Sequence, residues 1–437
     1  MKSENGNASL PWFKGLTGYH WLVLIVASLG WAFDTMDQWI FNLAKGPAIA
    51  DLLGLQTGAP QVSRLVGWAT AIFILGWATG GFVFGMVGDK LGRTRTMMIT
   101  VGMYAVFTGL SGLAQDATTF IILRFLTGLG IGGEFAAGAA LVAEVFPDRS
   151  RATALGVMQA CSALGNITAG VVDLVVHQYA VTYPAWRIMF LVGITPALLT
   201  VVLRFFVREP ERWHQAREAA LAGAKGLGAL PELFRDRVLR GRTLVGVGLA
   251  SVGVIGFWGI GVFSPELFRH ALNPLDLAEM HKSVEQQKSI CVIMQQVGAF
   301  FGILAWTWVA QRVGRRRAFA LAFLACLVVV PLCFHCTTSF ITGLIWFPLL
   351  GFVVTSLFGG YAIYFPELYP TRLRATGTGF CYNVARYISV IGPIAFGSLA
   401  ASVGFKWAAT IISVVFVFGL LVLIWAPETH GKPLPED

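Results

Sequence analysis

Two carboxyl groups lie close together in an apolar stretch near the start of the chain. Asp34 and Asp37 belong to the run Phe33-Asp34-Thr35-Met36-Asp37. In a helix they share one face, about 4.5 Å apart along the axis. Burial and mutual repulsion favour a proton on at least one of them, as a proton carrier requires. The alternative is that both lie at a hydrated helix end and only cap it.

A later apolar stretch carries an arginine and a glutamate among glycines. Arg124 is followed by the glycine-rich run 128–133 and then by Glu134. A guanidinium stays charged at physiological pH and needs an anion, which could be either aspartate, Glu134 or a substrate carboxylate. We expect Asp34, Asp37, Arg124 and Glu134 to form the proton-coupling site. A structural ion pair, with Glu134 as a helix-packing group, is the alternative.

Amide, phenol and guanidinium groups in other apolar stretches could bind a carboxylate. Gln159 and Asn166 lie seven residues apart, on one stripe of a helix. Arg386 shares a helix face with Asn383 and lies about one turn from Tyr382, and such donors suit an acid ligand. The predicted substrate site consists of Arg386, Asn383, Tyr382, Gln159, Asn166, Gln295 and Gln296. A structural pairing of Arg386 within the second half of the chain is the alternative.

The composition indicates that a membrane surrounds these residues. Of the 437 residues, 56% are hydrophobic and 13% are charged, about half the charge of a soluble domain. Apolar runs of about 20 residues cross a bilayer as helices. About twelve such spans are expected, near 20–43, 65–87, 96–115, 118–145, 152–176, 186–207, 243–266, 288–310, 316–335, 339–365, 374–401 and 405–426. The expected fold class is therefore an all-α membrane protein.

Two charged turns occur twice, which indicates a duplicated architecture. The stretch 88–95 aligns with 310–317, and 144–153 aligns with 367–376, at nearly the same offset. Matching turns in the two halves predict two pseudo-symmetric six-helix bundles, as in many secondary transporters. The expected division is an N-terminal tail (1–19), a first bundle (20–207), a central loop (208–242), a second bundle (243–426) and a C-terminal tail (427–437).

The basic residues collect in turns on one side of the expected spans, which places both termini and the central loop in the cytoplasm. The net charge of +9 is therefore not a sign of nucleic-acid binding. Cys333, His335 and Cys336 form a small cluster without a second pair of metal ligands, so packing is the favoured interpretation. We expect no cofactor and no metal. No nucleophile–base set is visible, so we do not expect an enzyme.

Several motifs resemble those of the major facilitator superfamily. Gly88-Asp89-Lys90-Leu91-Gly92-Arg93 resembles its signature between the second and third helices, and Arg124 with its glycines resembles its fourth-helix motif. The runs 208–213 and 427–431 resemble turns of its sugar-porter and organic-ion branches. The resemblance covers nearly the whole chain. It implies a transporter that alternates access to a central site.

The resemblance also suggests a branch and a gate. Asp34-Thr35-Met36-Asp37 is similar to the paired-aspartate motif of aromatic-acid and sialate proton symporters, although Thr35 replaces their usual glycine. Proton coupling is thereby implied at both aspartates. The implied cytoplasmic gate consists of Asp89, Arg93, Glu144, Arg151, Arg315, Glu367 and Arg374. Gln311 replaces the aspartate in the second copy, which implies a weaker gate there.

These features favour a proton-coupled importer of a small organic anion, such as an aromatic acid, another carboxylate or an acidic sugar. It would use H+ as its co-substrate and act as a monomer in the plasma membrane, of the bacterial inner-membrane type. The fifth span has Gly165-Asn166-Ile167-Thr168 where drug antiporters have Gly-Pro, so export is disfavoured. A sugar or polyol facilitator or symporter is the main alternative. A receptor that binds ligand without moving it is a second alternative.

Overall fold

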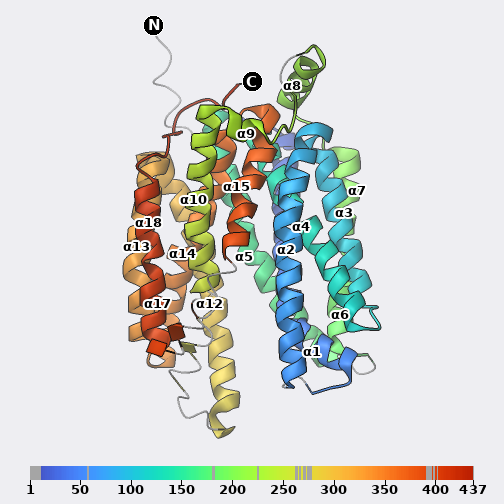
Figure 1. Cartoon of the computed structure of the whole chain (residues 1–437), viewed down its shortest axis with the longest axis vertical. Coiled ribbons are helices and arrows are strands. Elements are labelled where there is room, and N and C mark those ends of the chain that lie inside the picture. The colour runs from blue at the N-terminus through green and yellow to red at the C-terminus, as the bar shows by residue number, and fades with distance from the viewer. Residues whose placement is uncertain are drawn as a thin grey trace.

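Long helices run between two opposite ends of the molecule (Figure 1). This computed structural model describes residues 11–56, 59–179, 183–223, 226–260, 278–389 and 402–436, with short pieces within 264–272 and 396–400. The first half contains α1 (Gly18–Leu53), α2 (Pro60–Leu91), α3 (Arg93–Ser111), α4 (Ala117–Val145), α5 (Asp148–Tyr179), α6 (Ala185–Val192) and α7 (Ala197–Phe206). The second contains α10 (Arg237–Gly259), α12 (Ala278–Val313), α13 (Arg315–Cys336), α14 (Phe340–Leu368), η2 (Thr371–Leu373), α15 (Arg374–Ser389), α17 (Phe405–Ser413) and α18 (Val415–Val422).

Each expected span coincides with a helix or with a pair of short helices, and the all-α fold class is confirmed. Eight helices among the described residues are long and apolar enough to cross a membrane. The span expected at 186–207 is interrupted between α6 and α7, where Pro196 lacks the N–H that a continuous helix needs. The ends of the spans 243–266 and 374–401 lie partly outside the described residues.

The stretch between the halves is more helical than its glycines suggest. It forms α8 (Glu211–Leu221) and α9 (Glu232–Arg235), and α10 already begins at Arg237. Asp236 accounts for that early start, because its carboxylate accepts hydrogen bonds from the backbone N–H groups of Val238 and Leu239, both at 2.8 Å. The expected loop 208–242 therefore contains two short helices and the beginning of α10.

The two halves repeat the same helix packing. In the first half α2 lies along α4, and in the second α12 lies along α14. Glycine permits both close approaches: a Cβ on Gly132 would come within 2.0 Å of the Trp77 carbonyl oxygen, and one on Gly351 within 2.0 Å of the Gln295 carbonyl oxygen. The halves meet mainly through two further pairs, α2 with α15 and α5 with α12, with additional contacts of α14 and α15 on α4 and α5. A space between these pairs is therefore enclosed by helices of both halves.

One end of the molecule, which we call the basic end, carries the repeated charged turns, α8, α9 and the segment 427–436 (Figure 1). Here a glutamate caps the first turn of a helix in each half. Glu209 accepts from the backbone N–H groups of Thr94 and Arg95, at 3.2 and 3.0 Å, at the start of α3. Glu428 does the same for α13. A carboxylate at a helix N-terminus satisfies its unpaired N–H groups.

The glycine before each capped helix makes room for the carboxylate. Gly92 has φ 110° and Gly314 has φ 92°, a region that favours glycine. A Cβ on either would collide with the capping group, at 2.3 Å from Glu209 Oε1 or 2.7 Å from Glu428 Oε2. The runs 208–213 and 427–431, which resemble turns of the sugar-porter and organic-ion branches, therefore have a structural role: each provides the glutamate that caps a helix.

Glu428 should make stability depend on pH. Its carboxylate accepts from the N–H groups of Arg315, Arg316, Thr429 and His430, at 2.9 to 3.1 Å. Burial alone would raise the pKa of Glu428, but these backbone bonds hold it below its ordinary value of 4.5. A depressed carboxyl pKa stabilises the fold above pH 4.5, and this stabilisation is lost as the pH falls further. Glu428→Gln should lower stability by about 1 kcal/mol at pH 7.

The measurement is a thermal unfolding series of the detergent-solubilised protein from pH 7 to pH 3.5. The difference between wild type and Glu428→Gln should shrink below pH 4.5. Glu436→Gln, which removes a carboxyl from the same C-terminal segment, serves as the control with no such difference. A Glu428→Gln difference that stays constant over the series would contradict the capping role.

Candidate functional site

A cavity of about 450 Å³ lies between the two halves. It extends from the middle of the bundle toward the end opposite the basic end, where Lys45 and Thr70 lie. Its walls are rich in aromatic and amide side chains, and they contain two cations. The lining residues are Trp31, Thr35, Gln38, Trp39, Asn42, Lys45, Thr70, Ile74, Trp77, Gln159, Ser162, Asn166, Val254, Phe257, Trp258, Gln296, Thr355, Phe358, Tyr382 and Arg386. No described carboxylate is among them.

Helix α1 contributes one continuous stripe to this cavity. Its lining residues lie at positions 31, 35, 38, 39, 42 and 45, and the repeated steps of three and four residues keep them on one face. Thr35 anchors the stripe, because its hydroxyl bonds the Ser162 carbonyl oxygen of α5 at 3.0 Å. A Cβ on the facing Gly165 would come within 2.0 Å of the Ala32 carbonyl oxygen. Close packing of α1 on α5 therefore fixes which face the cavity sees.

Arg386 is the inner cation of the cavity. Its guanidinium lies 4.0 Å from the ring centroid of Trp77 on α2 and 4.5 Å from that of Tyr382. It donates to the Asn383 side-chain oxygen, and the Asn383 amide donates to the Gly379 carbonyl oxygen at 2.9 Å. Stacking on aromatic faces orients the guanidinium while it remains able to bind an anion. Asn383 itself is not a lining residue, so it positions Arg386.

Three of the five predicted glutamine and asparagine residues line the cavity, and two, Asn383 and Gln295, do not. Asn166 donates to the Gln296 side-chain oxygen at 2.9 Å, which joins α5 to α12 across the two halves. Gln159 lines the wall, and its side-chain oxygen has no described hydrogen-bond partner. Gln295 instead accepts a hydrogen bond from Ser264 at 2.8 Å inside the second half. Gln295 is not among the cavity-lining residues in this conformation, and its role as a substrate ligand stays a prediction.

Lys45 is a cavity residue that the sequence analysis missed. Its ammonium donates to Asn42 Oδ1 at 3.0 Å and to Thr70 Oγ1 at 3.1 Å, and it lies over the Phe41 ring. We expected the first span to end at residue 43, which placed Lys45 in a turn. Helix α1 continues to Leu53. The three- and four-residue spacing from Gln38 through Asn42 to Lys45 was the available signal.

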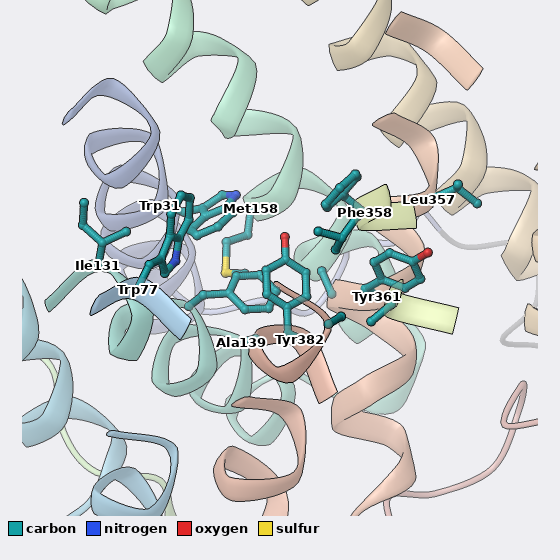
Figure 2. Packing of buried hydrophobic residues seen from close by; sticks show 14 of the residues in the cluster. Trp31, Trp77, Ile131, Ala139, Met158, Leu357, Phe358, Tyr361 and Tyr382 are labelled. Carbon is teal, nitrogen blue, oxygen red and sulfur yellow. The ribbon is translucent and has the colours of Figure 1, made fainter. Parts of the chain in front are cut away.

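The cavity is closed toward the basic end by aromatic contacts between the halves. The rings of Phe135 on α4 and Tyr382 on α15 stack with centroids 4.3 Å apart. Figure 2 shows Trp31 and Trp77 on one side of Tyr382 and Phe358 and Tyr361 on the other. Beyond this layer, a Cβ on Gly379 would lie 2.4 Å from the Gly81 carbonyl oxygen, so α15 and α2 are in direct contact.

Buried ion pairs at the basic end join the halves beyond this aromatic layer. Glu144 on α4 pairs with Arg93 of its own half at 2.8 Å and with Arg374 of the second half at 2.7 Å. Arg93 also pairs with Asp89 at 2.9 Å and donates to the Thr371 carbonyl oxygen at 2.6 Å. All four charged side chains are fully buried. The structure is thus closed at the basic end.

Asp89 adds a second connection between the halves. Its carboxylate accepts from the N–H groups of Ala375 and Thr376 and from the Thr376 hydroxyl, at 3.2, 2.8 and 2.6 Å. It therefore caps α15, a helix of the opposite half. Separation of the two halves at the basic end would leave the N-terminus of α15 without this cap.

The duplicated turn in the second half makes a weaker connection. Gln311, at the position of Asp89, donates one hydrogen bond to Thr153 of the first half at 2.5 Å. Arg315 pairs with Glu367 at 2.8 Å, but both belong to the second half. Arg151 pairs with Asp148 and bonds the Ala143 carbonyl oxygen, all within the first half. In the described residues the charged bridges between halves therefore come from Asp89, Arg93 and Glu144.

A second group of buried charges lies inside the first half, beside the cavity. Arg124 on α4 pairs with Asp37 on α1 at 3.6 Å. It donates to the Ser111 hydroxyl at 2.7 Å and to the Thr127 hydroxyl at 2.9 Å, while Asp37 accepts from the Thr108 hydroxyl at 2.5 Å. Among the anions considered for Arg124, Asp37 is the one it pairs with. This pair is buried and hydrogen-bonded at both ends.

Asp34 lies against Glu134 of α4 and Tyr104 of α3. All three are buried, and neither Asp34 oxygen makes a hydrogen bond of ordinary geometry with a described residue. Gly30, one turn earlier on α1, leaves space for Glu134, whose Oε1 would lie 2.4 Å from a Cβ there. Two carboxyl groups thus meet without a cation between them.

The four residues of the predicted proton-coupling site lie outside the cavity wall. Asp34, Asp37, Arg124 and Glu134 are not among the cavity-lining residues. The three-residue spacing of the aspartates does place them on one face of α1, but that face packs on α3 and α4. The connection to the cavity is electrostatic, since Asp34 is close enough to interact with the Arg386 guanidinium.

The cluster of cysteines and histidine lies far from these groups in the second half. Cys333 is buried, Cys336 is exposed, and His335 Nε2 lies 3.2 Å from the Thr410 hydroxyl. No group of three or more potential metal ligands occurs among the described residues. Packing and one hydrogen bond account for this cluster.

Comparisons with known proteins agree with this architecture. The model of the family described as Major Facilitator Superfamily matches residues 27–278 and 271–436. A "Probable 4-methylmuconolactone transporter" of Cupriavidus pinatubonensis is 30% identical over 92% of this chain and 89% of its own. A "Cis,cis-muconate transport protein" of Acinetobacter baylyi is 27% identical over 80% and 82%. Among solved structures, the proton:xylose symporter XylE of E. coli matches with a TM-score of 0.75 at 19% identity, covering 95% of this chain and 98% of that one.

The inter-half ion pairs should control opening at the basic end. Glu144→Gln leaves Arg374 buried without its anion, so it should shift the equilibrium toward the state open at that end by about tenfold. Spin labels at the exposed positions 95 on α3 and 317 on α13 would report this as a longer-distance population. Glu367→Gln is the matched control, because it breaks an equally short pair inside one half. Equal shifts in the two variants would contradict the proposed gate.

Proposed function

The chain belongs to the Major Facilitator Superfamily, and we propose that it is a proton-coupled symporter that imports a small organic anion. Membership makes it a membrane transporter rather than an enzyme. The two six-helix bundles would rock about the central cavity, so that it opens to each side in turn. The described geometry, closed at the basic end, corresponds to the outward-facing state of such a cycle.

The observation that carries the choice of substrate is the charge of the cavity. Lys45 and Arg386 line it, while no described carboxylate does. Such a site attracts an anion and repels a cation. Rings from Trp31, Trp39, Trp77 and Phe358, among others, favour a flat or aromatic body attached to that anion.

The relatives support this choice. The names of the Cupriavidus and Acinetobacter proteins give 4-methylmuconolactone and cis,cis-muconate as the compounds that they transport. Two more distant relatives bear the names of a niacin transporter and a sialic acid transporter. All four names point to small organic acids or their lactones, which matches a cationic, aromatic cavity.

Proton coupling is proposed to reside in the buried carboxyl groups beside the cavity. Asp34 and Glu134 lie together in a region where two charges would repel strongly, so one proton shared between them is the favoured state. An anion bound at Arg386 would weaken the attraction between Arg386 and Asp34. Protonation of Asp34 would thus favour anion binding at Arg386. Anion binding would in turn favour protonation of Asp34, since coupling between two sites is reciprocal.

Asp37 and Arg124 would hold this site in place. Their ion pair fixes α1 against α4, with Asp34 one turn before Asp37 on α1. The proposed gate comprises Asp89, Arg93, Glu144 and Arg374 between the halves. Arg151, Arg315 and Glu367 support it within each half.

The proposed setting is a plasma membrane of the bacterial inner-membrane type, with the basic end in the cytoplasm. The charged turns, α8, α9 and the segment 427–436 all lie at that end, as the positive-inside rule requires. Two bundles, residues 20–207 and 243–426, joined through 208–242, would act as a monomer with H+ and the organic anion as partners. The sugar-porter alternative loses its main support, since Glu209 and Glu428 cap helices.

Binding of acids and sugars to the purified protein tests the proposed substrate class. Benzoate should raise the melting temperature of the detergent-solubilised protein, and D-xylose should not, because a ligand stabilises the state it binds. Arg386→Gln should weaken benzoate binding at least tenfold. Lys406→Gln removes an exposed cation outside the cavity and should leave binding unchanged. Stabilisation by xylose alone would favour the sugar alternative.

Transport in liposomes tests the coupling. Acidifying the outside should drive accumulation of the bound acid by the wild-type protein. Asp34→Asn should abolish accumulation above the external concentration while exchange of internal for external substrate persists. Asp51→Asn, a change of the same chemistry at the outer end of α1, is the matched control and should accumulate normally. Undiminished accumulation by Asp34→Asn would exclude Asp34 as the coupling site.

A further inference from the structure

Lys45 has the geometry of a second anion-binding group at the outer part of the cavity. Its two described hydrogen bonds, to Asn42 and Thr70, use two of the three donors of an ammonium group. The Thr70 hydroxyl donates to the Val66 carbonyl oxygen at 2.8 Å, so its lone pair is directed to Lys45. In the described part of the chain no carboxylate pairs with Lys45. A cation held in place with a remaining donor is suited to an external acceptor.

The distance between the two cations follows from α2. Thr70 binds Lys45, and Trp77 stacks on Arg386. Seven residues separate these contacts, which corresponds to about 10 Å along the helix. Ile74 lies between them on the same stripe and lines the cavity. The wall is therefore cationic at both ends and apolar in the middle.

We propose that the cavity is built for a dicarboxylate whose two acid groups are joined by a flat aromatic or conjugated spacer. Arg386 binds one carboxylate, and Lys45, held by Asn42 and Thr70, binds the other. Ile74 and the aromatic rings contact the spacer. The proposal rests on the proposed function, since it names the substrate class of the same cavity.

The arrangement also gives such a substrate a role in closure. Lys45 belongs to the first half and Arg386 to the second. A ligand held at both ends connects the halves on the outer side of the cavity, whereas a monocarboxylate at Arg386 does not. Binding energy from the second carboxylate can therefore contribute to closing the outer end.

The test compares terephthalate with benzoate, which has the same ring and one carboxylate fewer, on the full-length protein in detergent by titration calorimetry. Wild type should bind terephthalate at least tenfold more tightly than benzoate, as expected for one added charge-assisted contact. Lys45→Gln should reduce this ratio about tenfold, and Lys45→Arg should restore most of it. Thr70→Val, which keeps the charge but removes its anchor, should give an intermediate ratio. Lys406→Gln should keep the wild-type ratio.

Each other outcome has a distinct meaning. If benzoate binds and terephthalate binds no better, the dicarboxylate site is refuted while the organic-anion function stands. If Lys45→Gln weakens the binding of terephthalate and of benzoate equally, Lys45 acts only through the electrostatic potential of its charge in the cavity. The second carboxylate subsite is then likewise refuted. If neither acid binds the wild-type protein, the proposed function fails together with this inference.

Discussion

This conformation depends on the ion pairs that Glu144 makes with both halves of the molecule. A single buried carboxylate pairs with one arginine from each half, Arg93 at 2.8 Å and Arg374 at 2.7 Å. Removing such charges from water is costly, and the cost is offset only while the partners stay in contact. The ion pair therefore couples a local contact to the position of whole bundles. In the proposed cycle the cavity would open at the end opposite the basic end while the basic end is held closed here.

The duplicated turns share a fold role and differ in their charge. In both halves a glycine with a positive φ, Gly92 or Gly314, precedes a helix. A glutamate distant in the sequence caps that helix: Glu209 caps α3 and Glu428 caps α13. The position that reaches across to the opposite half is Asp89 in one copy and Gln311 in the other. Asp89 accepts three hydrogen bonds from the start of α15, whereas Gln311 donates one to Thr153. The same backbone thus supports one strong and one weak connection between the halves. The substitution of Gln311 for aspartate accounts for this difference.

Much of the fold could be predicted from the sequence because a bilayer leaves few alternatives. Apolar runs, repeated turns and the distribution of basic residues determined the spans and the two bundles. These features did not determine the rotation of each helix about its axis, and so did not show which of its faces lines the cavity. The spacing of Asp34 and Asp37 showed that they share a face of α1, but only the packing of α1 on α5 through Thr35 and Gly165 decides that this face lies away from the cavity. For the adjacent Gln295 and Gln296 the sequence did not distinguish the two faces of α12, and only Gln296 lines the cavity.

For the proposed coupling, carboxyl groups on the face of α1 that lies away from the cavity would be more effective than carboxyl groups in direct contact with it. A carboxylate in the cavity wall would repel the anion in every state and would compete for Arg386. In the proposed mechanism Asp34 would instead act on Arg386 through space, and substrate and proton would occupy separate places. Since α1 carries cavity residues on one face and Asp34 with Asp37 on the next, a small rotation of this helix changes both environments at once. The proposed proton site and the proposed substrate site would thereby be connected through one rigid helix rather than through a chain of contacts.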